Sequence, residues 1–145
     1  MSKNYPNQRF FISILSLILS LSMSSCTSGL EKKLVGTWKG SDFLFVKTGG
    51  IDLVATINGG LDQHLKSKLI LNEDGTYKKL VGEYDNGSGT WELEDDKLIT
   101  TGEDGNELIY TLLKVTDNEL VTIHDVTIAT PNGEQAGKIT LSYSQ

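Results

Sequence analysis

Clusters of glycine, asparagine and aspartate interrupt the chain at short intervals, and they constrain its fold more than any other feature. The clusters begin at Thr48, Asn58, Asn72, Asp85, Glu94, Gly102, Thr116 and Pro131. Their spacing of about 8 to 15 residues is typical of the turns in an antiparallel meander. Glycine adopts positive φ without strain, and Asn or Asp side chains bond to nearby backbone, so these residue types suit tight turns. The sequence therefore predicts a series of hairpins.

The segments between the turns alternate apolar and polar residues with the period of a β-strand. Trp91 and Leu93 face one way in residues 89–94, and Ile139, Leu141 and Tyr143 share a face near the C-terminus. Residues 107–115 are apolar at both sets of positions, which predicts a strand covered at least in part on both faces. Sequential strands usually pair, and closing the sheet removes its exposed edges. The predicted fold is all-β, an antiparallel up-and-down barrel of about eight strands.

Residues 51–71 are the ambiguous part of this pattern. Ile51, Val54, Leu61 and Leu65 are spaced as in a short amphipathic helix. Asn58 and the two glycines that follow it stand in the middle of that segment, and such residues weaken a helix. We favour two strands here, with a short helix as the alternative.

The N-terminus has the layout of a secretory signal. Lys3 and Arg9 precede an apolar run at residues 10–23, which is too short to span the ~30 Å hydrocarbon core of a bilayer. Residues 23–26, Met-Ser-Ser-Cys, resemble the lipobox of bacterial lipoproteins, in which the cysteine becomes the lipidated first residue. The resemblance implies a signal peptide at residues 1–25, acyl chains such as palmitate on Cys26, a short linker at 26–33 and a barrel domain at 34–145.

The charge of the chain argues against several classes of partner. Removal of the signal takes the net charge from −6 to −8, which disfavours nucleic acid and anionic membrane surfaces. Cys26 is the only cysteine, so no internal disulfide can form. The only arginine, Arg9, lies in the signal. An anion-binding site in the mature protein would therefore depend on lysine, without the guanidinium fork.

Both tryptophans of the chain stand in the same tripeptide, Gly-Thr-Trp, ending at Trp38 and Trp91. Between them comes Asp-Gly-Thr-Tyr, ending at Tyr77. This order of motifs, over residues 34–125, resembles the lipocalin-like lipoproteins of the Bacteroidetes group of bacteria. The resemblance implies a lipocalin-like β-barrel that holds a small hydrophobic ligand. Tryptophan buries a large area, and we expect Trp38 and Trp91 to be structural anchors of the barrel rather than ligand contacts.

True lipocalins cover the tryptophan of this motif with an arginine from a late strand. The mature chain has no arginine. Lys114 and Lys138 are the candidates for this place.

Catalytic and metal-binding material is sparse. His64 and His124 are the only histidines, and we expect both to be structural. Asp125 follows His124 but points to the opposite face of a strand, so the two cannot act as a pair. The acidic loops at residues 85–89 and 103–107 lack the calcium-loop frame, and their composition suits turns. We therefore predict no enzyme activity, no metal and no cofactor.

Two functions remain open. The first is a lipoprotein anchored to a membrane, expected to be the outer membrane of the cell envelope, with an extracytoplasmic barrel that binds a small hydrophobic ligand. The second is a structural or protein-interaction lipoprotein whose barrel is filled by its own side chains. An empty apolar cavity of ~300 Å³ or more would favour the first, and a packed interior the second.

Overall fold

Eight antiparallel strands, connected in sequence order, close into a barrel in the computed structural model, which describes residues 29–145. The strands are β1 Gly36–Gly50, β2 Ser67–Leu71, β3 Thr76–Val81, β4 Tyr84–Glu94, β5 Lys97–Gly102, β6 Glu107–Val115, β7 Glu119–Thr130 and β8 Gly133–Ser144. Pairing of β1 with β8 closes the sheet. The prediction of an eight-stranded up-and-down barrel is confirmed. The predicted signal peptide and Cys26 lie outside the described residues.

The alternation seen in the sequence sets the inner and outer faces of the strands. Trp91 on β4 and both Leu141 and Tyr143 on β8 are buried, as their positions predicted. The two tryptophans belong to one hydrophobic core. Trp38 is 0% and Trp91 6% exposed. Both indole N–H groups are satisfied, since Trp38 Nε1 donates to the carbonyl of Leu34 at 2.7 Å and Trp91 Nε1 to that of Asn72 at 3.0 Å.

A short helix, α2 (Gly29–Leu34), lies where the linker was expected. Leu34 ends it, is fully buried, and supplies the carbonyl that accepts the Trp38 hydrogen bond. These contacts hold the end of α2 against the core. Lys114 and Lys138 do not cover Trp38, because each forms a surface ion pair, with Glu119 and Asp125 respectively. The expectation that a lysine replaces the lipocalin arginine was therefore wrong.

The preference for two strands in residues 51–71 was also wrong. The segment forms helix α3 (Val54–Leu65) followed by the single strand β2. The helix packs on β1, with Gly60 against the ring of Phe43 and His64 buried. Val54 and Leu65, which suggested the apolar stripe, are exposed. Tertiary packing thus overrides the ~1 kcal/mol that each glycine costs a helix relative to alanine.

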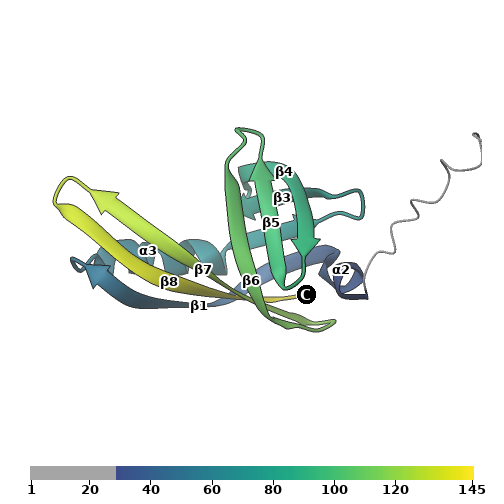
Figure 1. Ribbon diagram of the computed structural model, residues 1–145, viewed down its shortest axis with the longest axis horizontal. Helices are drawn as coiled ribbons and strands as arrows, with labels where there is room; N and C mark the ends of the chain where they lie inside the picture. Colours follow the sequence, from purple (N-terminus) through teal and green to yellow (C-terminus); the bar gives the residue numbers. More distant parts are fainter. Residues whose placement is uncertain (1–28) are drawn as a thin grey trace, which may run out of the picture.

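Strands β6 and β7 separate along part of their length. Their pairing runs from Val115↔Leu120 to Thr111↔Ile123, whereas β7 pairs with β8 along its whole length. In Figure 1, β7 and β8 run outward with β1, away from the group formed by β3 to β6. Leu108 of β6, which lies at this gap, is more than half exposed, and so are Ile109 and Leu113 on the opposite face of the strand. This strand was expected to be covered at least in part on both faces. Tyr110 on the inner face is buried, whereas Ile109 and Leu113 on the outer face are more than half exposed, so the expectation is met mainly on the inner face.

Candidate functional site

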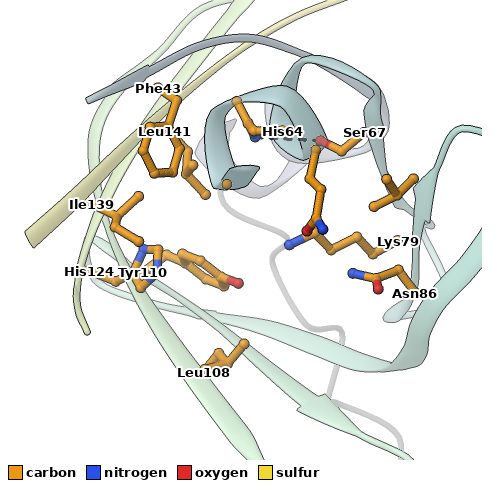
Figure 2. Close-up of a pocket in the computed structure, with 13 residues that line it drawn as sticks. Phe43, His64, Ser67, Lys79, Asn86, Leu108, Tyr110, His124, Ile139 and Leu141 are labelled. Atoms are coloured by element: carbon orange, nitrogen blue, oxygen red, sulfur yellow. Dashed lines mark hydrogen bonds between the residues drawn. The ribbon is translucent and has the colours of Figure 1, made fainter. Parts of the chain in front are cut away.

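The hydrophobic core includes Leu34 of α2 and both tryptophans, and a hollow lies beneath α3. The hollow is a cavity of about 190 Å³, shown in Figure 2. Residues from α3 and from every strand except β5 line it: Phe43, Gly60, Gln63, His64, Ser67, Lys79, Val81, Asn86, Leu108, Tyr110, His124, Ile139 and Leu141. Its volume is below the ~300 Å³ at which pockets for drug-sized ligands begin. The interior therefore matches neither sequence-based alternative, since it is neither a large apolar cavity nor fully packed.

The cavity is apolar on one side and polar on the other. Phe43, Ile139 and Leu141, from β1 and β8, form the apolar side, and Lys79 and Asn86 lie across from them in Figure 2. Each strand lines the cavity with the side chains at its inward-facing positions. On β1 and β8 these side chains are apolar, whereas on β3 and β4 they include Lys79 and Asn86. An arrangement of this kind can orient an amphipathic molecule.

Lys79 brings a positive charge into the barrel. It alternates on β3 with Lys78, whose ammonium lies 2.9 Å from Asp85 in an ion pair on the outer surface. Burial lowers the pKa of Lys79 below its ordinary value of 10.5. Within residues 29–145, none of the ion pairs that the structure forms includes Lys79. The ammonium group therefore faces the cavity without a carboxylate to balance it.

Tyr110 supplies a second hydrogen-bond donor. Its ring is buried, and burial raises the pKa of its hydroxyl to about 12, so the group stays protonated at neutral pH. Figure 2 shows the side chains of Tyr110 and Lys79 pointing toward each other across the cavity. The two donors therefore converge on one region of the space.

Both histidines of the chain lie in the wall of this cavity. His64 Nε2 lies 2.8 Å from the carbonyl of Ser142, and its ring packs edge-on against Tyr143 with centroids 4.8 Å apart. The ring of His124 packs edge-on against Tyr110 at 5.0 Å. Burial lowers the pKa of each histidine below 6.5, and the charge of Lys79 acts in the same direction. Both rings are thus favoured in the neutral form.

The predicted separation of His124 and its neighbour is confirmed. Asp125 points outward and binds Lys138 at 2.8 Å. In the described part of the chain, no group of three or more His, Cys, Asp or Glu side chains is arranged to hold a metal ion. The carboxylates of the two acidic loops accept backbone N–H bonds within their own turns, Asp85 from Gly87 and Asp104 from Asn106.

A surface groove lies beside the cavity. This groove, of about 410 Å³, follows the outer side of β6 and β7 where they separate. Leu108 and His124 line both the groove and the inner cavity. The groove and the inner cavity therefore adjoin at these two residues.

Comparison with known families shows to which family the chain belongs. A model of the lipocalin-like domain family matches residues 34–122. The chain belongs to the lipocalin-like domain family. The match begins at helix α2's last residue and ends within β7, so this lipocalin-like domain contributes most of the cavity wall. No match to the chain is found among curated proteins.

The family relationship confirms the resemblance inferred from the Gly-Thr-Trp and Asp-Gly-Thr-Tyr motifs, while the bacterial group stays a prediction. Lipocalin-like proteins are typically binding proteins rather than enzymes. Trp38 and Trp91 do not line the inner cavity. Among the functional residues, the sequence analysis missed Lys79. A signal existed, because two adjacent lysines in a strand must face opposite sides of the sheet.

Proposed function

We propose that this lipocalin-like protein holds a small amphipathic molecule in the cavity beneath α3. The observation that carries the proposal is the cavity itself, which combines an apolar wall with unpaired hydrogen-bond donors. Empty cavities in proteins are usually apolar, and polar ones hold water or a ligand. The family to which the chain belongs, typical of binding proteins, supports the same function.

The size of the cavity limits the ligand. A volume of 190 Å³ corresponds to roughly six water molecules at ~30 Å³ each. We therefore expect a compact molecule rather than the long hydrophobic ligand of a larger barrel. This narrows the sequence-based expectation of a small hydrophobic ligand.

Native mass spectrometry of the full chain, released gently from the envelope of its host, tests this function. We expect a population that carries a small-molecule adduct, which is lost after extraction with organic solvent. The proposal would be contradicted if the protein shows only its own mass and also binds neither hexanol nor hexanoate.

We further propose that the protein is an extracytoplasmic lipoprotein anchored through Cys26 to the outer membrane. The charged start, the apolar run and the Met-Ser-Ser-Cys motif of the N-terminus support this location. Within residues 29–145, neither helix is long and apolar enough to cross a membrane. Two or three acyl chains would anchor the protein stably, since each buried CH₂ contributes about 0.8 kcal/mol.

Changing Cys26 to Ala tests the anchor. We expect this variant to move from the membrane fraction to the soluble extracytoplasmic fraction, because the acyl acceptor is lost. Fractionation followed by immunoblotting measures the shift. Changing Ser25 to Ala serves as the control and should leave the protein in the membrane. Retention of Cys26→Ala in the membrane pellet would show that the anchor lies elsewhere.

A further inference from the structure

The charge lining the cavity is opposite to that of the rest of the protein. The chain contains 19 Asp and Glu residues and has a net charge of −6. None of the residues that line the cavity is acidic, and Lys79 is the one lysine among them. A buried charge without a partner is costly, and in binding sites such a charge commonly meets its counterpart on the ligand. The interior is therefore suited to an anion.

We propose that the ligand is a compact organic monocarboxylate, whose carboxylate binds Lys79 and Tyr110 and whose apolar end packs against Phe43, Ile139 and Leu141. This inference rests on the proposed function, because it assigns the chemistry of a ligand held in the same cavity.

The number of donors favours one negative charge on the ligand. Lys79 offers an ammonium group, and Tyr110 offers a neutral hydroxyl that remains protonated. The two histidines are favoured in the neutral form by burial. A single carboxylate would be neutralised by a single lysine, whereas a phosphate of charge near −2 would keep an uncompensated charge in a partly buried site.

The apolar side gives the ligand its second feature. Phe43, Ile139 and Leu141 lie across the cavity from Lys79 in Figure 2, so a ligand bound at the lysine extends its other end toward them. A cavity of 190 Å³ suits an acid of about four to six carbons, that is, roughly six to eight heavy atoms, because covalently bonded atoms each take somewhat less space than the ~30 Å³ share of a water molecule. Hexanoate has this form, and hexanol is its uncharged analogue.

Titration calorimetry of the full chain in nanodiscs of zwitterionic lipid, with empty nanodiscs as the blank, tests the assignment. We expect the wild type to bind hexanoate more tightly than hexanol. Lys79→Met should weaken hexanoate binding by roughly 10- to 100-fold, the usual effect of a charge-assisted hydrogen bond, and Tyr110→Phe by about 3- to 10-fold. Hexanol binding should change by less than about twofold in Lys79→Met, because the alcohol carries no charge to pair.

Lys78→Met is the matched control, because Lys78 is the next residue of β3 and its ammonium pairs with Asp85 outside the barrel. It should leave the binding of both probes unchanged. If Lys79→Met binds hexanoate as the wild type does, or if Lys78→Met weakens it equally, the assignment to Lys79 is overturned. Equal binding of hexanol and hexanoate by the wild type would overturn the carboxylate while leaving the binding function intact. Absence of binding by both probes would overturn the assignment of the ligand, and together with a native mass spectrum that shows no adduct it would also contradict the proposed function.

A second measurement does not depend on any variant folding. Hexanoate labelled with ¹³C at its carboxyl carbon reports its own ionisation through the chemical shift. In the wild-type protein at neutral pH, we expect the bound probe to show the shift of the ionised carboxylate and to stay ionised to lower pH than the free acid, because a nearby cation favours the charged form. A bound probe that protonates more readily than free hexanoate would contradict the pairing with Lys79.

Discussion

Changing Trp38 to Ala should lower the free energy of unfolding by about 3–5 kcal/mol, the usual range for emptying a large aromatic site. Trp38 has no exposed surface, and its indole N–H is held by the carbonyl of Leu34 at 2.7 Å. The substitution leaves a cavity and also removes the contact that fixes α2 on the barrel. Because domains of this kind have total stabilities of about 5–15 kcal/mol, the loss would unfold a large fraction of the protein.

Urea unfolding followed by circular dichroism measures this effect. Tyr84→Ala is the control, because that aromatic residue is 81% exposed and its removal should change the stability by no more than about 0.5 kcal/mol. Trp91→Ala should resemble Trp38→Ala, since Trp91 is also buried and hydrogen-bonded. Midpoints for both tryptophan variants equal to that of the wild type would show that these residues are not anchors of the core.

The second large effect is expected at Gly40, where β1 passes beneath the end of α3. A Cβ added there would overlap the backbone carbonyl of His64 and approach the hydroxyl of Ser67 to 3.0 Å. The obstacle is backbone, so Gly40→Ala must displace the end of α3 or the strand. We expect a loss of about 1–3 kcal/mol in the free energy of unfolding. Affinity for hexanoate should fall as well, because His64 and Gln63 of α3 form part of the cavity wall.

Gly59→Ala is the matched control for this variant. Gly59 lies in α3 itself, is exposed, and has no atom within 4 Å of the position that a Cβ would take. Replacement by alanine should therefore raise the stability by about 0.5–1 kcal/mol through helix propensity. Equal melting temperatures for Gly40→Ala and the wild type would show that α3 does not depend on close contact with β1.

Local sequence determined most of the barrel. Turn residues and the alternation around Trp91 and Leu141 depend on neighbours in the chain, so they can be identified without knowing the fold. Helix α3 could not, because its helical state depends on packing with β1, where Gly60 meets Phe43, and that contact is long-range. The exposure of Leu108 was also unpredictable, since it results from β7 leaving β6.

The candidate site likewise combines features that the local sequence indicates with features that depend on long-range contacts. Adjacent lysines at 78 and 79 already implied that one of them enters the barrel. Nothing local indicated that His64 and His124, sixty positions apart in the sequence, share one cavity wall. Their meeting follows from barrel closure, which brings α3 over the inner faces of β6, β7 and β8.

The central claim is that a small molecule binds inside the barrel beneath α3, and nuclear Overhauser contacts test it most directly. The full chain, labelled at its leucine, isoleucine and valine methyl groups, would be mixed with whichever of hexanol and hexanoate binds more tightly. We predict contacts from the probe to the methyl groups of Ile139 and Leu141, which line the cavity. Contacts only to Leu44 and Val46, which are exposed on β1, would contradict the account.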